Sequence, residues 1–352
     1  MSLESENLNP AIFKVLSIDG GGFRGLFSST VLSEFERING SISKHFDMLC
    51  GTSTGGLIAL ALAAGCSSHH VVEFYKTWGP KIFPKPTLYR KLIRKISPTF
   101  APNSRNTNKA LKEAIQTIVG DKKISDSNSY LCIPALNLID YSPLVFKTDH
   151  DPFLTRDSDG LMKDVGLATA AAPFYFPATT AIHLPGSQFL DGGLWANNPS
   201  LVGLVEAGRF FVGKEKPYKK VQILSISSVS PAAGRMKSEK CELSLLTSGG
   251  DVFTATLESQ QKATEHFIKF IIPTLNFEVE YVRVPCPQVA IDHCEFIGLD
   301  IADKKAIELL EFYGRKIGNE WNAKPKIQSF FGQEALPPKF RSDFVKGENV
   351  NV

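Results

Sequence analysis

The chain has 352 residues, of which 43% are hydrophobic and 21% charged, the composition of an ordinary globular protein. Its formal net charge of +3 is too small to indicate binding to nucleic acid polymers, and no apolar run reaches the roughly 18 residues that a membrane-spanning helix needs. The polar, acidic start is unlike a secretory signal, and the six cysteines stand singly, without a CxxC pair. We therefore expect reduced thiols and a cytoplasmic protein.

Strand-like and helix-like segments alternate along the chain. The expected strands cover residues 13–19, 45–50, 130–139, 143–148, 188–193 and 221–228. The expected helices cover residues 26–38, 57–64, 69–78, 106–120, 161–172, 200–211, 243–270 and 302–321. This alternation favours an α/β fold with a mostly parallel sheet covered by helices. No linker divides the chain, so we expect one domain over residues 1–322, followed by a polar tail over 323–352.

The sequence "GTSTGG" connects the strand at 45–50 to an apolar helix. Gly51-x-Ser53-x-Gly55 has the form of a nucleophile elbow, in which small neighbours allow a serine to occupy a sharp, strained turn. The helix that follows favours developing negative charge at its N-terminus. Taken alone, the pattern also fits a plain tight turn or a phosphate cradle.

A second glycine-rich turn, "DGGGFRG" (19–25), also follows a strand and precedes a helix. Its consecutive glycines Gly20, Gly21 and Gly22 can direct backbone N–H groups into one cavity, as an oxyanion hole requires. The spacing Gly20-x-Gly22-x-x-Gly25 also fits a dinucleotide-binding loop. That reading needs an acidic residue at the end of a second strand, and the acidic residues of that region lie in the expected helix.

The stretch "FLDGGLWANNP" (189–199) places Asp191 at the end of a strand. Gly192 and Gly193 leave room beside the carboxylate, which can then orient and deprotonate a serine. An aspartate that merely opens a turn would produce the same local pattern.

Together these motifs resemble the patatin-like phospholipase family, which is also matched by "ATAAAPFYFPA" (168–178) before the DGG strand. The resemblance covers residues 13–230, in the family's motif order. It implies a three-layer α/β/α sandwich with a mostly parallel central sheet. It also implies a catalytic dyad of Ser53 and Asp191, without histidine, metal or cofactor.

By the same resemblance, Ser53 attacks an acyl ester of a membrane phospholipid and Asp191 takes up its proton. Gly20, Gly21 and Gly22 would stabilise the oxyanion. The supporting positions are Arg24, Gly51, Gly55, Gly192 and Gly193. Arg24 has three open interpretations: it steadies the glycine loop, lies near the lipid phosphate, or forms a structural salt bridge.

Three alternatives stay open at this stage. A Ser-Asp-His esterase would take its histidine from positions after Asp191, namely His266 or His293. A nucleotide-binding module would use both glycine turns as phosphate cradles, although neither is followed by a P-loop lysine. A non-catalytic storage or scaffold protein is disfavoured because every catalytic position is present.

The segment 81–105 holds seven basic residues and no acidic one. Arg90, Lys91, Arg94 and Lys95 alternate there with apolar residues at helical spacing. A basic amphipathic helix of this kind can lie on an anionic membrane. A lid over the site, a binding site for an anionic regulator and a solvated surface helix are the other interpretations.

The stretch "SPLVFKTDHDP" (142–152) resembles bacterial patatin-like proteins, including cyclic-dinucleotide-activated effectors of anti-phage defence. The resemblance implies a cyclic dinucleotide activator. We further expect a membrane phospholipid substrate at the inner face of the cell membrane, and a homo-oligomer in which two copies share the ligand. No nucleic acid polymer is implied as a partner.

Overall fold

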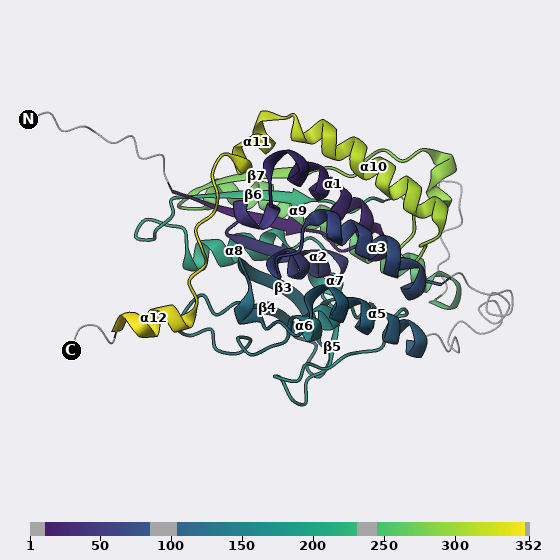
Figure 1. The fold of residues 1–352 in the computed structure, drawn as a ribbon, viewed down its shortest axis with the longest axis horizontal. Coiled ribbons are helices and arrows are strands. Elements are labelled where there is room, and N and C mark those ends of the chain that lie inside the picture. The colour runs from purple at the N-terminus through teal and green to yellow at the C-terminus, as the bar shows by residue number, and fades with distance from the viewer. Residues whose placement is uncertain (1–10, 85–103, 231–244, 349–352) are drawn as a thin grey trace, which may run out of the picture.

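The structure, a computed structural model, describes residues 11–84, 104–230 and 245–348, with side chains omitted at 104–107, 245–253 and 345–348. Its centre is one sheet of strand order β4-β3-β2-β1-β6-β7, with β5 paired to β3 outside that path (Figure 1). The strands are β1 (Ile12–Ile18), β2 (Met48–Gly51), β3 (Tyr130–Asn137), β4 (Pro143–Lys147), β5 (Phe189–Asp191), β6 (Lys220–Ile226) and β7 (Glu278–Val284). Strands β4 and β5 run antiparallel to β3, and the other pairs are parallel. The predicted mostly parallel sheet is confirmed.

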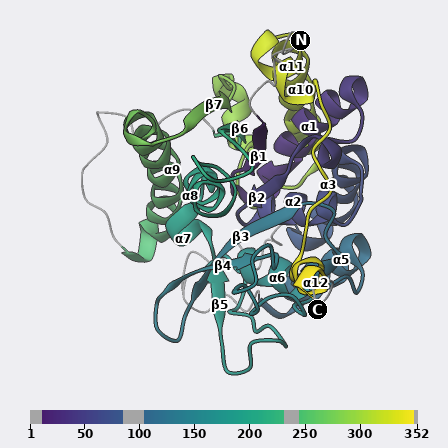
Figure 2. The ribbon, with the colours of Figure 1, turned by 90° about the vertical axis from the view of Figure 1, so that its left-hand side faces the viewer.

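Helices cover both faces of the sheet, as Figure 2 shows. The helices are α1 (Gly25–Asn39), α2 (Thr54–Ala63), α3 (Ser68–Ile82), α5 (Ser104–Val119), α6 (Met162–Thr169), α7 (Gly193–Ala196), α8 (Ser200–Phe210), α9 (Leu245–Ile271), α10 (Lys304–Asn322), α11 (Pro325–Phe331) and α12 (Arg341–Glu348). Helices α7, α8 and α9 lie on one side, and α1, α2, α3 and α10 on the other. The three-layer sandwich is therefore confirmed. Within the described ranges, none of the helices combines the length and the apolar character that crossing a membrane would require.

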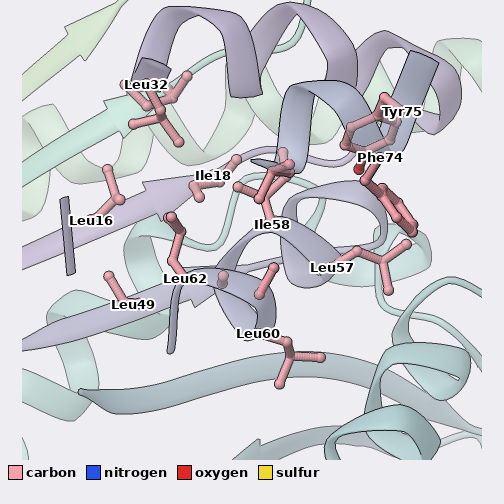
Figure 3. Packing of buried hydrophobic residues seen from close by; sticks show 14 of the residues in the cluster. Leu16, Ile18, Leu32, Leu49, Leu57, Ile58, Leu60, Leu62, Phe74 and Tyr75 are labelled. Atoms are coloured by element: carbon pink, nitrogen blue, oxygen red, sulfur yellow. The ribbon is translucent and has the colours of Figure 1, made fainter. Parts of the chain in front are cut away.

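The sequence of β1 explains why the sheet is buried on both faces. Leu16 and Ile18 belong to the core that contains α1, α2 and α3, whereas Phe13 and Val15 pack into a second core beneath α8. Parallel strands covered on both faces read as continuous apolar runs, which is the pattern here. All ten residues of α2 are buried, and Figure 3 shows its leucine and isoleucine side chains projecting into the first core. A helix that is apolar all round has to be buried in this way.

The structure contains elements that the sequence reading missed. Strand β7 reads "EVEYVRV", an alternating pattern that is typical of a half-buried strand. The short helices α7, α11 and α12 were also missed. The basic segment falls largely in 85–103, outside the described residues, so the predictions for Arg90, Lys91, Arg94 and Lys95 stay predictions.

Part of the expected polar tail packs against the domain. Ile327, Phe330 and Phe331 of α11 are buried, and the ring of Phe330 stacks on Phe46 with 5.9 Å between centroids. The buried Lys14 Nζ donates to the Phe330 carbonyl oxygen at 3.1 Å. Helix α11 therefore covers the amino end of the central strands, and a domain boundary at residue 322 stays a prediction.

Replacing Phe330 with alanine tests whether this packing stabilises the domain. The side chain is fully buried, so Phe330→Ala should lower the free energy of unfolding by ~3–5 kcal/mol in urea titrations. Leu336→Ala, at a position 70% exposed, is the control and should change it by less than ~0.5 kcal/mol. Equal values for the two variants would mean that α11 does not belong to the cooperative unit.

Candidate active site

Ser53 occupies the sharp turn between β2 and α2. Its φ of 55° and ψ of −124° are strained for a residue other than glycine. The flanking positions have to be small, because a Cβ at Gly51 would lie 2.1 Å from the Gly55 carbonyl oxygen, and one at Gly55 would lie 2.2 Å from that of Ile18. The turn therefore has the strand–elbow–helix geometry that its sequence predicts.

Hydrogen bonds from a distant segment hold this turn in place. The Ser53 N–H donates to Thr169 Oγ1 at 2.9 Å, and Thr169 Oγ1 donates to the Pro134 carbonyl oxygen at 2.7 Å. Thr52 Oγ1 donates to the Ala196 carbonyl oxygen at 2.6 Å. Sequence reasoning did not single out Thr169, and its only signal is its place in the "ATAAAPFYFPA" stretch.

The register of β5 brings Asp191 to the serine. Residues 130–132 of β3 pair with β2, and Ala135, further along β3, pairs with Asp191. Since β4 occupies the other edge of β3 at Ala135, β5 lies just beyond the carboxyl end of β2. Ser53 Oγ donates to Asp191 Oδ2 at 2.6 Å, and the Gly193 N–H donates to Asp191 Oδ1 at 2.7 Å.

Burial controls the acidity of this carboxyl. Asp191 is only 2% exposed, and the loss of hydration raises its pKa to about 7, against the lowering effect of the hydrogen bonds from Ser53 and Gly193. A carboxyl with a pKa near neutrality can both accept and return a proton, which is what a general base and acid has to do.

The histidines lie apart from this pair. All seven are within the described ranges, and none of them hydrogen-bonds to Ser53 or Asp191. The His266 ring contacts the tilted ring of Phe270 in its own helix, with 4.5 Å between centroids, and His293 Nδ1 lies 2.9 Å from the Tyr313 hydroxyl. The geometry thus gives no support to the Ser-Asp-His alternative. Among the described residues, no group of three or more His, Cys, Asp or Glu side chains could hold a metal ion.

The "DGGGFRG" turn lies directly against the serine, since a Cβ at Gly20 would be 3.3 Å from Ser53 Cβ. Gly22 has a φ of +59°, and a Cβ there would collide with the Leu299 carbonyl oxygen. The amides of Gly21 and Gly22 have no acceptor within the described parts of the chain. The prediction for Gly20 needs correction, because its N–H already donates to the Asn197 carbonyl oxygen at 2.9 Å.

Arg24 holds this turn from behind. It is 2% exposed, its Nε donates to the Gly21 carbonyl oxygen at 3.2 Å, and its guanidinium lies 3.8 Å from Glu258 Oε1. In a trans peptide the N–H points opposite to the C=O, so the Gly22 N–H points away from Arg24. Of the three interpretations of Arg24, the geometry favours two together: Arg24 steadies the glycine loop, and it forms a structural ion pair with Glu258.

An apolar pocket opens beside Ser53, Asp191, Gly21 and Gly22. Its walls come from η1 (Gly22–Arg24), α2, α3, α5 and the stretch after α6. They carry Phe23, Leu57, Phe74, Tyr75, Ile82, Phe83, Leu111 and Phe176. A slot of this chemistry suits a hydrocarbon chain, because it offers aromatic and aliphatic contacts and few polar ones.

The "SPLVFKTDHDP" stretch forms a buried polar cluster elsewhere in the fold. Lys147 Nζ donates to Glu206 Oε2 at 2.5 Å, and His150 Nε2 lies 3.0 Å from Glu206 Oε1. These groups satisfy one another between β4 and α8, so the stretch has a structural role in this fold.

Comparison with known proteins agrees with this geometry. The family model described as patatin-like phospholipase matches residues 16–202, just over half of the chain. The chain belongs to this family, a class of lipid acyl hydrolases, which overturns the reading as a nucleotide-binding module without hydrolase activity.

Three similar relatives share one name, "cGAMP-activated phospholipase". The one from Pseudomonas aeruginosa is 29% identical over 97% of both chains. Those from Escherichia coli and Vibrio cholerae are each 31% identical over 93% of this chain, covering 94% and 96% of theirs.

The raised pKa of Asp191 predicts a gain in stability on removing its charge. A raised pKa means that the folded state favours the protonated carboxyl. The corresponding contribution to the free energy of unfolding is fully present below pH ~4 and is lost as the pH rises through the folded-state pKa of about 7. Asp191→Asn keeps the shape without the charge. Its melting temperature should exceed that of the wild type by several degrees at pH 8, and the difference should shrink towards pH 5.

Calorimetric scans at both pH values measure this effect. Asp292→Asn, whose side chain is 83% exposed, is the control and should melt as the wild type does. A variant at position 191 that is less stable than the wild type at pH 8 would contradict the assigned cost of burying the charge.

Proposed function

We propose that the chain hydrolyses acyl esters of membrane phospholipids, with Ser53 as nucleophile and Asp191 as general base. The observation that supports this most directly is the 2.6 Å hydrogen bond from Ser53 Oγ to Asp191 Oδ2 at the mouth of the apolar pocket. The pocket receives the acyl chain, so that the ester carbonyl lies next to the serine.

The reaction proceeds in two halves. Ser53 Oγ attacks the carbonyl carbon as Asp191 takes up the hydroxyl proton, and the protonated Asp191 returns that proton to the departing lysophospholipid oxygen. A water molecule then attacks the acyl-serine, Asp191 accepts its proton, and the fatty acid leaves as Ser53 regains its hydrogen. Because Asp191 has to start ionised, the rate should rise as the pH passes through about 7.

Gly21 and Gly22 are the proposed oxyanion donors. Their N–H groups have no other acceptor within the described ranges, and they line the same pocket as Ser53. A preorganised donor of this kind typically contributes ~10²–10³ in rate. Gly51, Gly55 and Gly192 leave space for the turns, and Gly193 orients the Asp191 carboxyl.

Removing the nucleophile tests the proposal. Ser53→Ala should abolish hydrolysis of a short-chain ester, and a fluorophosphonate should label the wild type at Ser53 and leave the variant unlabelled. The circular dichroism spectrum should be unchanged, because alanine fits the elbow. Labelling of another residue, or activity that survives in Ser53→Ala, would disprove the assignment.

Histidine variants complete this test. His266→Ala and His293→Ala should keep most of the activity, whereas Asp191→Asn should lose several orders of magnitude in kcat. A loss in either histidine variant as large as that of Asp191→Asn would instead establish a triad.

We also propose that a cyclic dinucleotide activates the enzyme at the inner face of the cell membrane and promotes a homo-oligomer. The support is the shared name of the relatives, together with the need to restrain an enzyme whose substrate is the cell's own membrane. The ligand has to bind the active state more tightly than the resting state. The basic segment with Arg90, Lys91, Arg94 and Lys95 stays a predicted contact for the membrane or the regulator.

Activation is measured on anionic phospholipid vesicles. We expect low basal hydrolysis, a rise of at least tenfold with one member of a cyclic dinucleotide panel, and a shift to higher mass in light scattering. Full activity without ligand, and no binding across the panel, would remove the regulatory proposal and leave the hydrolase assignment intact.

A further inference from the structure

A second cavity of about 690 Å³ lies where β6 and β7 end beside α9. It has no lining residue in common with the apolar pocket. Its walls combine apolar surface with the polar side chains of Ser227, Ser228, Gln261, Lys262, Glu265 and Arg283. The volume falls within the ~300–1,000 Å³ typical of small-molecule sites, and the carboxyl end of a parallel sheet is where α/β folds bind ligands.

Ser227 and Lys262 line this cavity and have no side-chain partner among the described residues. Ser227 is 2% exposed, and its hydroxyl forms no hydrogen bond among the described residues. Buried polar groups are nearly always paired, so an unpaired hydroxyl on a residue that lines a cavity is a candidate partner for a ligand or a water molecule. Lys262 is exposed and forms no ion pair within the described parts of the chain, which leaves its charge available.

The remaining charges in the cavity are already balanced. Arg283 is held by Asp19, with Nη2 to Oδ2 at 2.6 Å, and its Nε lies 3.6 Å from Glu265 Oε2. Glu265 also accepts a hydrogen bond from Lys269 Nζ at 2.8 Å. Within the part of the chain that the structure describes, the cavity thus offers Lys262 as an unpaired cation, together with carboxylate oxygens that can accept further N–H donors.

The cavity also touches the back of the glycine turn. A Cβ at Gly21 would lie 2.2 Å from Ser228 Oγ, so this side chain packs directly on the turn. Gln261 Nε2 donates to the Gly20 carbonyl oxygen at 3.5 Å. Glu258, another lining residue, lies 3.8 Å from Arg24, which holds the Gly21 carbonyl.

We propose that this cavity binds the activating ligand, a cyclic purine dinucleotide. Lys262 contacts a phosphate, the Ser227 hydroxyl hydrogen-bonds to the ligand, and Glu265 accepts from the N–H groups of a purine edge. Ligand contacts with Ser228 and Gln261 bias the position of Gly21 and Gly22 and so connect binding to oxyanion stabilisation. This inference rests on the proposed cyclic dinucleotide activation.

Calorimetric titration of the full chain with cyclic GMP–AMP tests the site, carried out in the Ser53→Ala background so that binding is measured without hydrolysis. Adding Lys262→Glu should raise Kd at least tenfold, because it replaces a charge-assisted contact with repulsion. Lys305→Glu makes the same charge change at an exposed position of α10 and should leave Kd unchanged. Equal Kd values for these two variants would overturn the site.

Two further titrations sharpen the result. Ser227→Ala removes only the unpaired hydroxyl and should weaken binding several-fold without affecting the melting temperature. Glycerol 3-phosphate represents a lipid head group and should bind at least a hundredfold more weakly than cyclic GMP–AMP. Equal binding of the two ligands, or no effect of Ser227→Ala, would contradict a nucleotide site here, whereas ester hydrolysis by the unliganded wild type reports on the hydrolase assignment separately.

Discussion

The candidate site depends on one edge of β3, which pairs with two different strands. Residues 130–132 hold β2, and residues 135–137 hold β5, so the end of β5 arrives where the elbow begins. A slip of one residue in that pairing would turn the Asp191 side chain to the other face of the sheet. This register requires a glycine at position 192, because a Cβ there would lie 2.3 Å from the Pro134 carbonyl oxygen. The hydrogen bond between Ser53 and Asp191 is thus a consequence of strand pairing.

The site is costly to fold, and the surrounding layers offset that cost. A backbone such as that of Ser53 is strained by about 1–3 kcal/mol, and Asp191 adds the penalty of burying a carboxylate. The completely buried α2 and the cores on both faces of the sheet hold the elbow rigidly. The Thr169 hydroxyl oxygen accepts the hydrogen bond that the Ser53 N–H donates in this strained turn. Active sites commonly trade stability for a strained, desolvated geometry in this way.

The glycine turn is held between two environments of opposite character. On one side lies the apolar pocket with the serine, and on the other lie Ser228, Gln261 and the Arg24–Glu258 pair. The buried ion pair of Asp19 with Arg283 ties the start of the turn to β7. Ser228, Gln261 and Glu258, which hold the far face of this turn, also line the second cavity. A ligand bound in that cavity would therefore act on the position of the turn through these contacts.

The sequence alone determined the parts of this protein that depend on neighbouring residues. Small residues around Ser53, consecutive glycines after β1 and a strand that ends at Asp191 are local requirements of backbone geometry, so they leave a readable pattern. The apolar runs of β1 and α2 likewise predict burial on both faces of the sheet.

Only the tertiary structure decided which partners these residues have. Ser53 meets Thr169 across 116 positions, Asp19 meets Arg283 across 264, and the Gly20 amide is paired with Asn197 instead of being free for an oxyanion. The sequence predicts that Phe330 belongs to a polar tail, whereas its packing on Phe46 places it in the core. Such contacts depend on how distant segments come together, and a single polar or aromatic residue carries no periodic signal that would reveal its partner.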